Sequence, residues 1–112
     1  MISEAYQAFV THAPDHHRAW AQAVDGLGQA SALDARTQAL AYVAVLAAVG
    51  NHSGIPFHVD QAVRHGATRA EVVSAVLVGL PAAGITVTAA LPAALAACPA
   101  EPTDEPGSDP AA

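Results

Sequence analysis

The sequence predicts an all-α fold, a single-domain bundle of five or six helices, and three observations support this prediction. Apolar residues recur at helical spacing along most of the chain. Signals that start and stop helices recur at short intervals, whereas no segment alternates apolar and polar residues for long enough to form a strand. A chain of 112 residues has room for one hydrophobic core. We therefore expect one helical domain over residues 1–98.

The first two helices are expected in the N-terminal third of the chain. Apolar and aromatic residues at helical spacing indicate one helix over residues 4–12. Asp15 carries a side chain suited to an N-cap, so we expect a second helix from there to about Val24. Gly26 and Gly28 are poor helix formers and are expected to end it.

A long central helix is expected next. Residues 31–34 supply capping side chains at its start, and Gly50 is the expected residue just past its end. The polar segment 51–54 then breaks the chain. Pro56 favours the first turn of a helix, because its missing N–H would be unsatisfied there in any case. We therefore expect the next helix over about residues 55–65.

The last part of the domain begins with the sharpest local signal. Thr68 and Glu71 fit a capping box, in which each side chain accepts a hydrogen bond from the other residue's backbone. The helix that follows should reach about Leu80, where Pro and Gly in residues 81–84 interrupt it before a last helix. Residues 99–112 are rich in Pro, Gly and acidic residues and predict a disordered acidic tail.

A membrane span is one alternative, because the segment 72–98 contains no charged residue and is long enough to cross a bilayer. Two prolines, two glycines and a predominance of alanine make this segment a weak candidate. The start of the chain has neither the basic region nor the long apolar run of a signal peptide. We therefore expect a cytoplasmic protein with no membrane partner.

The composition points to self-association. Apolar residues make up 53% of the chain and charged residues only 12%. Such a chain has little polar surface with which to cover a monomer, and large apolar patches usually mark interfaces. We therefore expect a homo-oligomer that buries apolar helix faces between its subunits.

The charged residues exclude one class of partner. The net charge is −6, but four of the ten acidic residues lie beyond residue 100, so the folded part is nearly neutral. The chain has no lysine, and its four arginines are scattered rather than gathered into the basic stripe that a phosphate backbone requires. No nucleic-acid partner is expected.

A motif in the middle of the chain resembles a known family. The sequence reads Asn51-His-Ser-Gly-Ile-Pro-Phe-His58 and then His65-Gly-Ala-Thr-Arg-Ala-Glu71, after a long helix. From about residue 33 to residue 97 this order is similar to the alkylhydroperoxidase D / carboxymuconolactone decarboxylase family. There, a turn carries Cys-x-x-Cys, a histidine follows four residues later, and a Gly-Ala-Thr-like turn precedes the next helix. His58 matches the family histidine.

The other family positions have changed. The two thiol positions fall on Asn51 and Gly54, and the relay glutamate falls on Ala39. A second histidine that some members carry between the cysteines falls on Ser53, although His52 is its neighbour. The sequence is therefore identified as a degenerate member without the cysteine pair. Its one cysteine, Cys98, is expected to be a small buried apolar residue.

The resemblance implies an alkylhydroperoxidase D-like helical fold assembled as a trimer or hexamer. Peroxide reduction by a dithiol needs a thiolate to attack, so a thiol peroxidase is disfavoured here. The decarboxylase branch works without a cysteine pair, although it usually keeps the acidic residue that is Ala39 in this chain. We therefore expect a non-redox, cofactor-free enzyme of the decarboxylase or isomerase/cyclase type. Its substrate would be a small carboxylated or enolisable molecule.

The candidate site follows from the helix that starts near residue 55. Its free N–H groups and its dipole favour a bound anion, such as the carboxylate of a substrate. His58 is the candidate catalytic residue, because an imidazole can move a proton near neutral pH. Asn51, His52, Ser53 and Phe57 are the candidate substrate-binding residues.

The sequence leaves other interpretations of the same residues open. His58 could be a structural histidine bonded to a backbone carbonyl, Ser53 a capping hydroxyl and Phe57 a core residue. The protein would then be a catalytically silent oligomeric module. No metal site is expected, because His58 and His65 lie about two helical turns apart, roughly 10 Å by helix rise.

Overall fold

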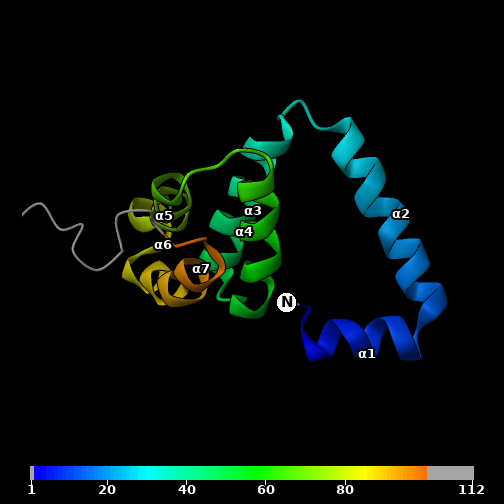
Figure 1. The fold of residues 1–112 in the computed structure, drawn as a ribbon. Coiled ribbons are helices and arrows are strands. Elements are labelled where there is room, and N and C mark those ends of the chain that lie inside the picture. Colours follow the sequence, from blue (N-terminus) through cyan, green and yellow to red (C-terminus); the bar gives the residue numbers. More distant parts are fainter. Residues whose placement is uncertain (1, 101–112) are drawn as a thin grey trace, which may run out of the picture.

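The fold is all-α, as expected, in a computed structural model that describes residues 2–100. Six helices of seven residues or more and one four-residue helix, α6, make up this part of the chain, together with two 3-10 segments and no strand. Figure 1 shows their arrangement. The elements are α1 (Glu4–His12), α2 (Pro14–Ala30), α3 (Ala35–Val49), η1 (His52–Gly54), α4 (Ile55–Arg64), α5 (Arg69–Leu77), α6 (Leu80–Ala83), η2 (Ile85–Ala90) and α7 (Leu91–Ala97).

The hydrophobic core lies within α3 to α7, a unit that we call the bundle. Helix α3 packs against α4 and α5, and α7 packs against both of those helices. The core side chains are small, because alanine and valine supply most of them, so the helices approach closely. The largest side chains with no exposed surface are Val43, Ile55, Val59, Val72, Val76 and Val87.

Helices α1 and α2 form a second unit, the arm, which packs chiefly on itself. The Tyr6 hydroxyl lies 2.9 Å from Nε2 of His17 across the α1–α2 corner. Phe9 and Trp20 stack edge to face on the same side, with ring centroids 6.2 Å apart. Neither helix has a buried residue. Figure 1 shows α2 diverging from the bundle at the link between α2 and α3, and α1 turning back toward the lower end of the bundle.

Two predicted boundaries of α2 were wrong. The helix begins at Pro14, with Ala13 at the N-cap position, and Asp15 instead lies in the first turn, where it accepts a hydrogen bond from Arg18. Pro14 explains the start, since its fixed φ suits the first helical position. The helix then runs through Gly26 and Gly28 to Ala30. Glycine weakens a helix by about 1 kcal/mol but does not end it unless a cap forms there.

The central boundaries were predicted correctly. The Asp34 carboxylate caps α3 by accepting from the Thr37 N–H at 2.8 Å. Gly50 follows α3 with a φ of 75°, the left-handed conformation that glycine adopts without steric cost. Pro56 lies in the first turn of α4, and the capping box of Thr68 and Glu71 starts α5.

The apolar segment after residue 72 is broken rather than continuous. Helix α5 ends at Leu77, three residues earlier than expected, and two short elements separate it from α7. No helix in the part of the chain that the structure describes is long and apolar enough to cross a membrane. Cys98 is buried just after α7, as its sequence context indicated. Beyond residue 100, the predicted tail lies outside the described residues.

The capping box allows a test of the fold. Replacing Thr68 by Ala removes the hydroxyl that accepts from the Glu71 N–H at 3.1 Å, and should lower the free energy of unfolding by about 1 kcal/mol. Glu71→Gln is the matched control, because the amide oxygen of Gln can still accept from the Thr68 N–H. This substitution should therefore lower the free energy of unfolding by less. Urea denaturation measures both variants. Equal losses in the two would contradict the capping role of Thr68.

Candidate functional site

The turn between α3 and α4 is held close to α3 by its glycines. Gly50 turns the chain through its positive φ, and η1 then leads into α4. A Cβ at Gly54 would lie 3.2 Å from a methyl group of Leu46, so a larger residue would require this turn to shift. Gly54 is the N-cap of α4 and provides no side-chain cap, while the Ile55 N–H donates to the His52 carbonyl of η1 and Pro56 has no N–H.

His58 lies in α4 with its ring half-buried between aromatic neighbours. Its ring centroid is 5.1 Å from that of Tyr42 on α3 and 5.2 Å from that of Phe57, both in edge-to-face geometry. No hydrogen bond joins its ring nitrogens to another of the described residues. Burial lowers the pKa of His58 below its ordinary value of 6.5, so the ring is neutral at pH 7. The ring nitrogens of His58 therefore have no partner among the described residues.

Two other histidines are occupied by partners. Nδ1 of His65 lies 2.7 Å from the carbonyl oxygen of Gln61, one turn back in its own helix. His17 pairs with the Tyr6 hydroxyl in the arm. A structural His58 would be bonded to a backbone carbonyl. In the structure, His65 and not His58 makes such a bond. The rings of His12, His16 and His52 also have no hydrogen bond to another described residue, so His58 is distinguished by its ring contacts with Tyr42 and Phe57.

Tyr42 is a member of this site that the sequence analysis missed. Its hydroxyl accepts a hydrogen bond from the Gln38 amide at 3.0 Å, and the residue is 38% exposed. A signal was present in the sequence, since Tyr42 follows Ala39 by three residues and therefore neighbours it on the surface of one helix. Ala39 is itself a core residue, 4% exposed, so a methyl group stands at the family's acidic position.

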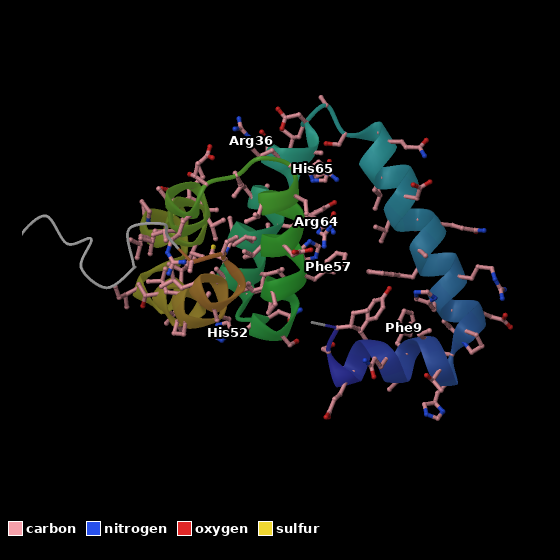
Figure 2. All side chains as sticks on the ribbon, viewed as in Figure 1. Phe9, Arg36, His52, Phe57, Arg64 and His65 are labelled. Atoms are coloured by element: carbon pink, nitrogen blue, oxygen red, sulfur yellow. The ribbon has the colours of Figure 1, made fainter. Side chains whose placement is uncertain are left out.

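The predicted substrate-binding residues fall into separate groups. Phe57 is 43% exposed and lies on the side of the bundle that faces the arm, whereas His52 lies at the lower end of the bundle (Figure 2). The Ser53 hydroxyl donates to Oδ1 of Asn51 at 3.1 Å, and both residues are exposed. Among the described residues no hydrogen bond links this pair to His58. The structure thus brings together Phe57, His58 and Tyr42, with the 51–54 turn at the start of the same helix.

The charges around α4 are paired and lie at its far end. Nε of Arg64 donates to the Asp60 carboxylate at 2.7 Å. Burial alone accounts for the lowered pKa of His58, with no contribution from a carboxylate. Within residues 2–100, no three His, Cys, Asp or Glu side chains are grouped to hold a metal ion.

The burial of His58 predicts a pH dependence. Its folded-state pKa lies below that of the unfolded chain, so on acidification the unfolded chain takes up its proton first. The stabilising contribution is therefore complete above pH 6.5 and falls as the pH decreases toward the folded-state pKa.

Two measurements check this dependence. In an NMR titration, the ring protons of His58 should have a midpoint below 6.5. In urea denaturation, His58→Gln should lose less stability than the unmodified chain between neutral pH and pH 5. A His58 midpoint at or above 6.5 would contradict the half-buried, unpaired ring.

Comparison with known proteins places the chain in a family. The sequence model of the carboxymuconolactone decarboxylase family matches residues 14–97. No curated protein and no solved structure matches the chain. The matched range includes the arm helix α2, the whole bundle to the end of α7 and the His58 site, while the single cysteine lies just beyond it. Because the match covers most of the 112 residues, this protein belongs to the carboxymuconolactone decarboxylase family, as a member without a Cys-x-x-Cys pair.

Proposed function

We propose that this protein is a non-redox, cofactor-free enzyme that moves a proton on a small carboxylated, enolisable molecule, with His58 as the base. One observation carries the proposal. The imidazole is half-buried, neutral at pH 7 because its pKa is lowered, and without a hydrogen-bond partner among the described residues. A structural histidine normally has a partner, whereas a general base must keep one nitrogen free.

The neutral ring favours a reaction that begins with proton abstraction. Nε2 or Nδ1 of His58 takes a proton from the carbon next to a carbonyl group, and the electrons of that C–H bond move onto the carbonyl oxygen as an enolate. The imidazolium then returns the proton to another carbon of the substrate, which completes an isomerisation. A lowered pKa makes the imidazolium a better proton donor, which favours this return step.

Decarboxylation would use the same histidine and the same enolate, but with the steps in a different order. The bond to the carboxylate carbon breaks, CO₂ leaves, and its electron pair forms the enolate, which then needs a proton. At pH 7 His58 is mostly unprotonated and would have to acquire that proton first. The lowered pKa therefore favours the isomerase branch over the decarboxylase branch.

The start of α4 is the proposed binding site for the substrate carboxylate. The dipole of α4 favours an anion near its start. The Ile55 N–H already donates to the His52 carbonyl and Pro56 has no N–H, so the contact to the carboxylate would come from the side chain of Asn51. The Asn51 side-chain amide, whose oxygen is engaged by Ser53, still has its N–H groups to donate. Phe57 and Tyr42 would flank the apolar part of the molecule on either side of His58.

Dithiol peroxide reduction is disfavoured on chemical grounds. The reaction oxidises two neighbouring thiols to a disulfide, and the chain has one cysteine. That cysteine, Cys98, is buried after α7 rather than at the α4 turn.

A catalytically silent oligomeric module is the second candidate, and a specific observation favours it. The family's acidic position is the core residue Ala39, and no carboxylate contributes to the pKa of His58. A base without an orienting acid is weaker, since the acid fixes the imidazole and stabilises its charged form.

Proton exchange distinguishes the two candidates. The unmodified protein should accelerate deuterium incorporation from D₂O into members of a panel of small oxocarboxylates and carboxymuconolactone, followed by NMR. His58→Gln should lower the rate at least ~100-fold, because it removes the base.

His65→Gln is the matched control for this experiment, since His65 bonds its own helix and should leave the rate unchanged. Melting temperatures of both variants report whether either change affects folding. A rate that survives His58→Gln, or no acceleration by the unmodified protein with any compound, would support the silent module.

A further inference from the structure

Tyr42 places a phenol beside the His58 ring, and the direction of its hydrogen bond follows from the chemistry of its partner. Nε2 of Gln38 lies 3.0 Å from the Tyr42 hydroxyl oxygen. An amide nitrogen can only donate, so the hydroxyl oxygen accepts this bond and its own hydrogen points elsewhere. Within residues 2–100, no side chain or backbone group accepts that hydrogen. The Tyr42 hydroxyl therefore has a proton to donate to a ligand.

Two helices hold the Gln38 amide in place. Gln38 and Tyr42 are four residues apart on α3, so their side chains meet on one face of the helix. On its other side the amide adjoins Gly28 of α2, where an added Cβ would lie 3.6 Å from Nε2. The glycine thus lets α2 pass within van der Waals contact of the amide. Because the amide is held between two helices, the hydroxyl hydrogen is directed before a ligand arrives.

The base and the donor are neighbours on two packed helices. The ring centroids of Tyr42 and His58 are 5.1 Å apart, and the rings meet edge to face. The neutral His58 ring can accept a proton, whereas the Tyr42 hydroxyl donates a hydrogen bond, so the two groups have opposite roles. Enolisation needs both, because a proton leaves carbon while negative charge develops on the adjoining carbonyl oxygen. A small molecule in contact with both rings can meet both needs.

We propose that the Tyr42 hydroxyl is a second catalytic group, which donates a hydrogen bond to the enolate oxygen, and that Gln38 is its positioning residue. His58 takes the proton from carbon, and the electrons of the C–H bond move onto the carbonyl oxygen, where the hydroxyl meets the developing charge. The phenol keeps its proton, and the imidazolium returns its own to carbon, so no co-reactant is consumed. The catalytic role rests on the proposed function, whereas the binding of an oxyanion at this hydroxyl does not.

The direction of the hydroxyl also selects the substrate. Gln38 is one turn nearer the start of α3 than Tyr42 and adjoins the end of α2, so the hydroxyl is directed toward the α2–α3 link. Asn51 lies past the other end of α3, and from Tyr42 to Val49 alone the helix rises roughly 10 Å. A carboxylate held at Asn51 and a carbonyl held at Tyr42 therefore belong to opposite ends of the substrate. We expect an oxo acid in which several carbons separate these groups.

Binding of a stable oxyanion tests the hydroxyl without catalysis. The probe is a nitrophenolate with an acetate group para to its oxygen, so its two negative groups lie at opposite ends, and its absorbance reports binding. Tyr42→Phe keeps the ring beside His58 but removes the donor. It should weaken binding at least ~10-fold, as expected for a hydrogen bond to a charged group. Tyr6→Phe is the matched control, because it removes the hydroxyl that pairs with His17 in the arm and should leave binding unchanged.

Variants of Gln38 test its positioning role. Gln38→Glu has the same shape, but its carboxylate accepts the Tyr42 hydrogen, so probe binding should fall as far as in Tyr42→Phe. Gln38→Met leaves the hydrogen available and should weaken binding less. The same nitro compound without its hydroxyl group measures the effect of the added charge, and melting temperatures report on folding. Equal effects of Gln38→Glu on the two compounds would show that Gln38 does not position the hydroxyl.

Deuterium exchange separates this inference from the proposed function. At saturating substrate, Tyr42→Phe should lower the exchange rate at least ~100-fold, the usual loss for one oxyanion donor, with little change in the half-saturating concentration. A rate lost in His58→Gln but kept in Tyr42→Phe would overturn the role of Tyr42 alone. No exchange by the unmodified protein, together with Tyr42-dependent probe binding, would refute the enzyme and leave the oxyanion site standing. Equal probe binding by the unmodified protein and Tyr42→Phe would overturn the inference whatever the exchange rate.

Two oxo acids test the substrate class. In levulinate two carbons separate the carbonyl from the carboxylate, whereas in pyruvate the two groups are adjacent. Relative to the uncatalysed rate, exchange into levulinate should be accelerated more than exchange into pyruvate, and Tyr42→Phe should remove this preference. A preference for pyruvate would contradict the placement of the two groups at opposite ends of the substrate.

Discussion

The packing of α3 against α4 is the contact on which the rest of this structure depends. Ala39, Val43 and Ala47 of α3 are buried in one core cluster with Val59 and Ala62 of α4. These side chains are short, so the two helices lie close together. Gly50 and Gly54 allow the turn between α3 and α4 to follow α3 closely. The site lies at the edge of this contact, where Tyr42 and His58 meet.

The same contact explains the chemistry that we assign to the site. Packing beside α3 buries half of the His58 ring and lowers its pKa, while no described side chain occupies its nitrogens. The chain's one cysteine, Cys98, lies after α7, so the turn before α4 carries no Cys-x-x-Cys pair. The proton transfer that we propose depends instead on the His58 ring.

The arm connects the composition of the chain to its assembly. A sequence that is 53% apolar and 12% charged contains more apolar surface than this bundle buries, and Trp20, Leu27, Val45 and Val49 are where much of it remains exposed. Exposed apolar surface of this extent is typical of protein interfaces.

The sequence by itself determined the helical class, the family and those boundaries that depend on local capping, such as Asp34, Gly50 and the Thr68–Glu71 box. Capping bonds join residues at most a few positions apart, so the local sequence contains the information. The continuation of α2 through its glycines, the divergence of the arm and the contact between Tyr42 and His58 were decided only by the tertiary structure. They depend on whether a competing cap forms, on the link geometry and on packing between two helices, which spacing along one chain does not reveal.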